Sequence, residues 1–119
     1  MTMKNNAVRK VFSKIPGKLA DYLRLDKTKE ESIIRACKEN DISFLGLFGS
    51  YARGDQKEQS DVDFLASFSR RKSLLDLVRI ERDLSGIIGI KVDLVTEKSL
   101  SPYLIERIKS EVKPIYYEG

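Results

Sequence analysis

The sequence contains no histidine and no tryptophan, and Cys37 is its single cysteine. One cysteine excludes a disulfide within the chain, and the lack of histidine removes the main nitrogen ligand of the common zinc sites. Cys37 is therefore predicted to be a small buried hydrophobe. Any bound metal would be an oxygen-preferring ion, magnesium or manganese, held by carboxylates.

Long apolar segments are also missing. No apolar run approaches the length that spans a bilayer, and the first ten residues, MTMKNNAVRK, lack the apolar stretch of a signal peptide. We therefore expect a soluble, cytoplasmic protein. Its 119 residues, of which 41% are hydrophobic and 34% charged, suit one domain with one modest core.

The net charge of +4 is unevenly distributed. Residues 1–27 hold seven Lys/Arg and two Asp, a net +5, whereas residues 28–119 hold fifteen Lys/Arg and sixteen Asp/Glu, a net −1. We interpret residues 1–27 as a basic N-terminal extension of the domain at 28–119. Either the extension attracts an acidic partner surface or, with less support, RNA, or its apolar residues pack on the core. These residues are Val11, Phe12, Leu19, Tyr22 and Leu23.

Apolar patterning predicts alternating helices and strands. Thr28 and Glu31 have the spacing of a capping box, which predicts a helix at about 28–40. ISFLGLF (42–48) is apolar on both faces, as is typical of a strand inside a sheet. DVDFLASF (61–68) and IKVDLVT (90–96) alternate apolar and polar residues and predict two further strands.

Two more helices and a last strand complete the predicted fold. A helix is expected from about Ser73 to Ser85, ending at Gly86. Ser99, Ser101 and Pro102 open another helix that runs to about Ser110, and KPIYYEG could add a short terminal strand. The core candidates of the 73–85 helix are Leu74, Leu75, Leu77, Val78 and Leu84.

Three aspartates, Asp61, Asp63 and Asp93, lie within apolar strands, where an ionised carboxylate is normally excluded unless its charge is compensated. Strand alternation directs Asp61 and Asp63 to the same face. If strands 61–68 and 90–96 are neighbours, the three carboxylates can gather and repel each other. This repulsion would raise at least one pKa, and a divalent cation would relieve it.

A purely structural interpretation of the same aspartates is also open. In that interpretation Asp61 caps its strand, Asp63 is exposed at a sheet edge, and Asp93 pairs with Lys91 or Lys98.

Gly49 and Ser50 directly follow the first predicted strand. Glycine adopts backbone conformations closed to other residues, so that a turn here can direct amides at a bound anion. The Ser50 hydroxyl and a short helix through YARG would add further donors for phosphate oxygens. The Gly-Ser pair therefore favours a function for the aspartates that follow it.

The segment GSYARGDQKEQSDVDF resembles the signature of the minimal nucleotidyltransferases, a branch of the DNA polymerase beta-like nucleotidyltransferase superfamily. The match consists of Gly49-Ser50, ten residues, Asp61-Val62-Asp63, and Asp93 on a later strand. It covers about residues 28–117. The resemblance implies an α/β (α+β) fold, a small mixed β-sheet flanked by helices, like the palm of polymerase beta.

The resemblance also implies roles for these residues. Gly49 and Ser50 would hold the triphosphate of ATP, and Asp61 and Asp63 would bind two Mg²⁺ or Mn²⁺ ions. Asp93 would complete the second metal site and help to activate the attacking hydroxyl. Two ions of this kind bridge the α-phosphate and neutralise the pyrophosphate leaving group. Arg53 has two possible roles, contact with a phosphate oxygen or pairing with Asp55 or another acidic neighbour.

Many stand-alone members of this family are antitoxins that transfer AMP from ATP to a tyrosine of a HEPN-type ribonuclease toxin. The resemblance implies this function here, with the toxin as partner. One alternative is nucleotide transfer to a small molecule such as an aminoglycoside. The other is a non-catalytic module that blocks its toxin by binding alone, although three intact aspartates argue against it.

Overall fold

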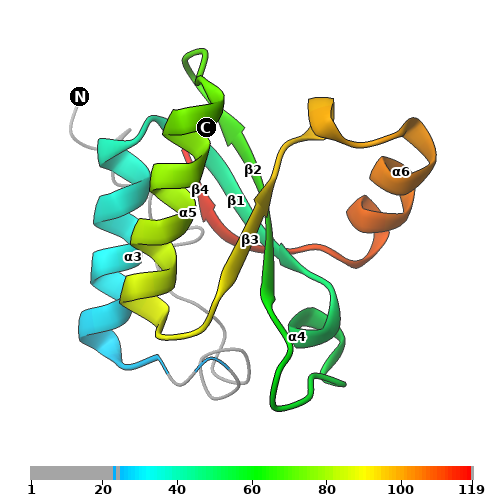
Figure 1. Cartoon of the computed structure of the whole chain (residues 1–119), viewed down its shortest axis with the longest axis horizontal. Coiled ribbons are helices and arrows are strands. Elements are labelled where there is room, and N and C mark those ends of the chain that lie inside the picture. Colours follow the sequence, from blue (N-terminus) through cyan, green and yellow to red (C-terminus); the bar gives the residue numbers. More distant parts are fainter. Residues whose placement is uncertain (1–22, 24, 119) are drawn as a thin grey trace.

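The computed structural model describes residue 23 and residues 25–118, which form a four-stranded sheet with flanking helices (Figure 1). In chain order the elements are α3 (Lys27–Glu39), β1 (Ile42–Phe48), α4 (Ser50–Arg53), β2 (Val62–Phe68), α5 (Leu74–Ile88), β3 (Val92–Val95), η1 (Glu97–Ser99), α6 (Pro102–Glu111) and β4 (Lys113–Tyr117).

The sheet is mixed, with strand order β3-β2-β1-β4. β1 pairs antiparallel with both β2 and β4, whereas β2 and β3 are parallel and are joined through α5. This arrangement confirms the predicted fold class and the interior position of strand 42–48. It also meets the condition stated for the aspartates, because the two strands that carry them are neighbours. The short terminal strand is also present, as β4.

One face of the sheet carries the core, because α3 and α5 lie side by side across it (Figure 1). Leu45 and Leu47 of β1 and Phe64 and Ala66 of β2 are buried toward these helices. Cys37 of α3 is fully buried among them, which confirms its predicted role, and burial raises the pKa of its thiol to about 12. Strand alternation leaves Asp63 on the opposite face.

The predicted core face of α5 is largely wrong. Leu74, Leu75 and Val78 are 75%, 80% and 42% exposed, whereas Leu84 is buried and Leu77 packs at the edge of the core. The stripe that faces the sheet has the helical spacing i, i+4, i+8, and the first turn of α5 extends beyond the covered face. This stripe consists of Ile80, Leu84 and Ile88.

The predicted end of α5 is also wrong. The helix continues past Gly86 to Ile88 and ends at Gly89, whose φ of +84° is the left-handed conformation of a helix C-cap. The physical reason is that Ile88 belongs to the buried stripe, so that the last turn gains more from burial than Gly86 costs.

The start of α3 differs from the predicted capping box. Asp26 is the N-cap, because its carboxylate accepts the Lys29 N–H at 2.8 Å, and Thr28 with Glu31 forms no cap. Leu23, from the predicted extension, is fully buried in the core, and Leu25 packs against it. The boundary at residue 27 stays a prediction. The other apolar residues predicted to pack from the extension, Val11, Phe12, Leu19 and Tyr22, lie outside the described residues.

None of the helices within residues 23 and 25–118 combines the length and the apolar character needed to cross a bilayer.

Candidate active site

Gly49 lies at the end of β1 and immediately before α4, in a conformation that favours glycine. Its φ is +78°, and a Cβ at this position would overlap the carboxylate of Asp63. Glycine is therefore required twice, for the positive φ and for the close approach of the Asp63 side chain to the backbone. Ser50 is the first residue of α4 and is partly exposed.

The three predicted aspartates come together at one end of the sheet. Asp63 of β2 lies beside Asp93 of β3 in the parallel register, and Asp61 comes just before β2 on the same face. Burial raises the pKa of Asp63 to about 6, helped by repulsion from Asp93 and Asp61 and opposed by Arg53. The repulsion expected from the sequence is therefore present at Asp63.

The structural interpretation of these aspartates fails at two points. Asp63 lies in an interior strand, not at a sheet edge. Lys91 pairs with Asp61, at 3.6 Å, and within residues 23 and 25–118 no ion pair involves Asp93. Asp93 lies exposed on the edge strand β3, where solvent, not a lysine, screens its charge.

The donor set fits a magnesium or manganese ion by its chemistry, since Asp61, Asp63 and Asp93 supply carboxylate oxygens and no softer ligand. In the described part of the chain, however, no three acidic or cysteine side chains lie close enough together to hold an ion without moving. The Asp61 carboxylate forms an ion pair with Lys91 instead. Exchange of this contact for a metal ion would relieve the repulsion that acts on Asp63.

Arg53, at the end of α4, pairs with carboxylates on two sides. Its Nε lies 3.2 Å from Asp55 Oδ2, and one terminal nitrogen lies 3.4 Å from Glu111 Oε1. These contacts raise the pKa of the Arg53 guanidinium, Asp55 being the main cause. Pairing with Asp55 was one of the two roles predicted for Arg53. Contact with a phosphate stays a prediction.

Glu111 was not singled out in the sequence, yet it contacts the predicted phosphate-binding turn. The Gly49 N–H donates to Glu111 Oε2 at 2.9 Å, across 62 residues of chain. β4 pairs antiparallel with β1, and this pairing brings the α6–β4 junction beside the end of β1. A predicted β1–β4 pairing is the signal that could have revealed Glu111.

Comparison with known proteins identifies the family of the chain. The family model for the nucleotidyltransferase domain matches residues 30–115. The chain belongs to the nucleotidyltransferase family. The motif Gly49-Ser50 through Asp63 lies well inside the matched segment, as does Asp93.

Relatives and solved structures extend the comparison. Protein adenylyltransferase MntA of Thermococcus cleftensis is 39% identical over 87 residues, 69% of this chain and 88% of the relative. A candidate protein adenylyltransferase of Methanocaldococcus jannaschii, MJ0435, is 43% identical over 82 residues, with the same coverage. A toxin-antitoxin structure with AMP-PNP has TM-score 0.65 and 25% identity, covering 78% of this chain and 74% of that one.

Proposed function

We propose that this nucleotidyltransferase is a magnesium-dependent protein adenylyltransferase that acts as an antitoxin. It transfers AMP from ATP to a tyrosine of a cognate HEPN-type ribonuclease toxin and so neutralises the toxin. The names of its relatives support AMP transfer to a protein, and its similarity to a toxin-antitoxin structure with a nucleotide analogue supports the partner class. The target tyrosine and the metal are expectations from the family resemblance.

One observation carries the proposal. The Asp63 and Asp93 carboxylates lie in register on adjacent strands, with Gly49 packed against Asp63 and the pKa of Asp63 raised. A fold that only had to be stable would gain from replacing this repulsion with apolar or neutral side chains. A site that binds a cation and a polyphosphate together needs these carboxylates close to one another.

The reaction can be assigned to the residues of this chain as follows. The tyrosine oxygen forms a bond to the α-phosphorus of ATP, the bond from that phosphorus to the pyrophosphate oxygen breaks, and pyrophosphate leaves with the electron pair. Asp93 takes up the hydroxyl proton. Gly49 N–H and the Ser50 hydroxyl hold phosphate oxygens, so that catalysis is mostly positioning and charge stabilisation. Magnesium bound by Asp61, Asp63 and Asp93 would supply Lewis acidity for the hydroxyl and the leaving group.

The test combines the chain with its toxin, ATP and Mg²⁺, and follows the intact mass of the toxin. We expect discrete mass increments of AMP on a toxin tyrosine, at least about 100-fold slower with Asp63→Asn or Asp93→Ala. Asp83→Asn, on the exposed surface of α5, makes the same chemical change outside the site and should leave the rate unchanged.

Two results would contradict the proposal. Equal ATP affinity with Mg²⁺ and with a chelator, measured by calorimetry, would show that nucleotide binding does not depend on a metal ion. If the triple variant of Asp61, Asp63 and Asp93 neutralises the toxin in cells as well as the unmodified chain does, binding alone is sufficient.

A further inference from the structure

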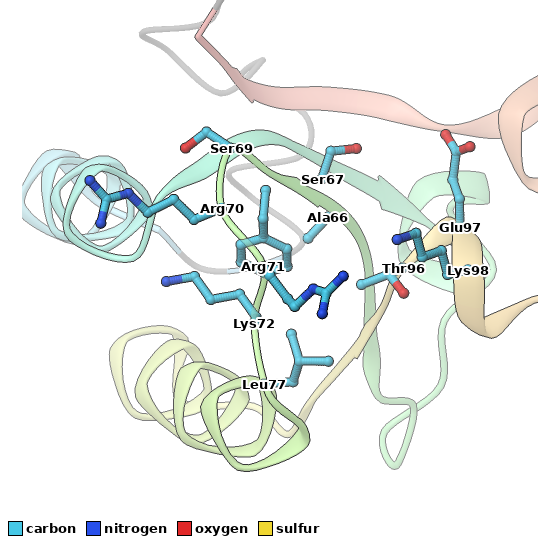
Figure 2. A pocket seen from close by; sticks show the side chains of 11 residues that line it. Ala66, Ser67, Ser69, Arg70, Arg71, Lys72, Leu77, Thr96, Glu97 and Lys98 are labelled. Atoms are coloured by element: carbon cyan, nitrogen blue, oxygen red, sulfur yellow. The ribbon is translucent and has the colours of Figure 1, made fainter.

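A second feature lies at the opposite end of β2 from the aspartates. It is a cleft of about 560 Å³ between two walls, the segment that leads from β2 into α5 and the segment that leads from β3 into η1 (Figure 2). Its lining includes Ala66, Phe68, Arg71, Leu77, Thr96 and Lys98. At a strand rise of ~3.3 Å per residue, Ala66 and Phe68 lie roughly 10 and 17 Å beyond Asp63.

The cleft is strongly basic although the body of the chain has a net charge of −1. Arg70, Arg71, Lys72 and Lys98 all line it, and among the described lining residues Glu97 is the one that is acidic. Lys109 pairs with Glu97 at 3.3 Å, and the Glu97 side chain points away from the cationic groups in Figure 2. The carboxylate of the cleft therefore does not neutralise it.

Two of the four cations converge. Arg71 and Lys98 extend into the cleft from its two walls, with Thr96 between them, whereas Arg70 points outward (Figure 2). Lys72 pairs with Asp41 at 3.0 Å, but no ion pair of Arg71 or Lys98 is present among residues 23 and 25–118. Two like charges held together in this way favour an anionic ligand between them.

An apolar surface borders the cleft. Leu74, Leu75 and Val78, on the first turns of α5, are the exposed side chains described above, and Leu77 of the same helix lines the cleft. Val78 lies four positions after Leu74 and three after Leu75, so that its side chain neighbours both on the helix surface and joins them into one patch. A ligand for this surface would combine carboxylates with apolar groups.

We propose that the cleft and the apolar patch together dock an acidic, partly apolar segment of the protein that accepts the AMP. The inference rests on the proposed function and assigns a surface to its partner. Carboxylates of the partner enter between Arg71 and Lys98, and its apolar side chains cover Leu74, Leu75 and Val78. Because Ala66 and Phe68 lie roughly 10 and 17 Å beyond Asp63, the partner has to span at least this distance between its docking segment and the hydroxyl that accepts AMP.

Other occupants are disfavoured by charge and by chemistry. The segment 1–22 carries five Lys/Arg and one Asp, and a second copy that docked through the same surface would present the same cations, so that both would be repelled. RNA binding to single strands relies on aromatic platforms. Within the described lining of the cleft Phe68 is the single aromatic residue, and the Lys72 ammonium lies over its ring at 6.0 Å.

The experiment measures association of the full chain with the HEPN-type toxin by biolayer interferometry at low and high salt. The test variant is Arg71→Glu with Lys98→Glu. Arg35→Glu with Arg82→Glu is the matched control, since it makes the same charge change at exposed positions on α3 and α5. We expect the test variant to slow association at low salt at least about tenfold and to flatten its salt dependence, with the control within about twofold.

A second variant tests the apolar part. Leu75→Asp should accelerate dissociation of the toxin at least about fivefold, because interface contacts act mainly on the dissociation rate. Affinity for ATP with Mg²⁺ should be unchanged in all these variants, which separates docking from nucleotide binding and reports that they are folded.

The outcomes distinguish this inference from the proposed function. If AMP transfer occurs but the test variant associates like the control, the docking surface is wrong and the function stands. If the variants lose association although the chain transfers no AMP, the surface stands and the function is wrong. Failure of the unmodified chain to associate contradicts both. If the charge reversal affects binding of a fluorescein-labelled single-stranded RNA but not of the toxin, the cleft is a nucleic-acid site and the inference is overturned.

Discussion

At the scale of single residues, the candidate site holds charges that the apo protein does not fully compensate. Asp63 is half-buried beside Asp93. The Glu111 carboxylate accepts the hydrogen bond of the Gly49 N–H, which is predicted to contact phosphate. In the proposed function each of these features would be relieved when a cation and a polyphosphate bind. The residues of the site are therefore best tested one at a time, against neighbours that lack this conflict.

Asp63→Asn should stabilise the metal-free protein at pH 7. Because the folded-state pKa of Asp63 is raised from 3.8 to about 6, its protonated form supports stability below pH 4, and this support is lost as the pH rises through 6. This rise of the Asp63 pKa from 3.8 to about 6 is worth ~3 kcal/mol, which solvent screening at this half-buried carboxyl reduces to about 1 kcal/mol.

Chemical unfolding from pH 4 to pH 7 measures this effect. The stability of the unmodified chain should fall relative to that of Asp63→Asn across this range, whereas Asp83→Asn should run parallel to the unmodified chain. A constant difference between pH 4 and pH 7 would show that Asp63 is not the titrating group.

Glu111→Gln should bind ATP more tightly than the unmodified chain. The variant keeps an oxygen acceptor for the Gly49 N–H but removes the negative charge that competes with phosphate and holds Arg53. The loss of one partly exposed repulsive charge predicts about three- to tenfold tighter binding. Glu106→Gln, at an exposed position of α6, serves as control in the same calorimetric titration. Weaker binding by Glu111→Gln alone would show that the carboxylate positions the turn instead of competing with the nucleotide.

Alanine substitution is expected to have opposite effects at two glycines, because Gly49 has a backbone conformation that favours glycine and Gly86 lies inside a regular helix. Gly49→Ala should cost about 1–3 kcal/mol and abolish ATP binding, because φ is positive and a Cβ would overlap Asp63. Gly86→Ala, in open space inside α5, should stabilise the fold by about 0.5–1 kcal/mol. Thermal unfolding compares the two, and tolerance of alanine at residue 49 would argue against the close packing of Gly49 on Asp63.

At the scale of elements, the local parts of the fold were accessible from the sequence and the long-range parts were not. Strand 42–48 was predicted with its observed bounds, and the alternation in DVDFLASF placed Asp63 on the correct face. Both follow from contacts between near neighbours along the chain. The face of α5 was not predictable in this way, because its first turn is as apolar as its buried stripe and the sheet alone decides which of the two is covered.

The candidate site shows the same division. Gly49, Ser50, Asp61 and Asp63 lie within one short segment, so that their spacing alone indicated a common site. Glu111 enters the site through the β1–β4 pairing, and no pattern within its own helix distinguishes it from Glu106, the other acidic residue of α6. The outward-facing leucines of α5 belong to the same class, since their exposure depends on what the sheet leaves uncovered.

Truncation of a buried and of an exposed leucine in α5 should change the free energy of unfolding by different amounts. Leu84→Ala should destabilise the protein by about 2–5 kcal/mol, because Leu84 is fully buried and its truncation leaves a cavity. Leu75→Ala should change stability by less than about 0.5 kcal/mol, because Leu75 is 80% exposed. Denaturant midpoints of the two variants measure the difference. A large loss for Leu75→Ala would show that this leucine is covered in solution.

At the scale of the whole molecule, the basic segment of the chain and the folded core overlap in sequence. The excess positive charge lies within residues 1–27, but the core already includes Leu23, and the N-cap of α3 is Asp26. A truncation at residue 27 would therefore remove parts of the folded domain together with the basic segment. The position of the cut decides which property an experiment measures.

Two truncations should separate these properties. Removal of residues 1–22 keeps Leu23 and should leave magnesium-dependent ATP binding unchanged, since the aspartates and Gly49 lie on the sheet. Removal of residues 1–27 should cost a further 3 kcal/mol or so, about 2 for burial of Leu23 and about 1 for the Asp26 cap.

Because residues 1–22 carry a net +4, the shorter truncation should also slow association with an acidic partner, most strongly at low salt. Stopped-flow association at two salt concentrations, with urea unfolding of both truncations, measures each effect. Unchanged association at both salt concentrations would exclude residues 1–22 from recognition, and equal stability of the two truncations would contradict the assignment of Leu23 to the core.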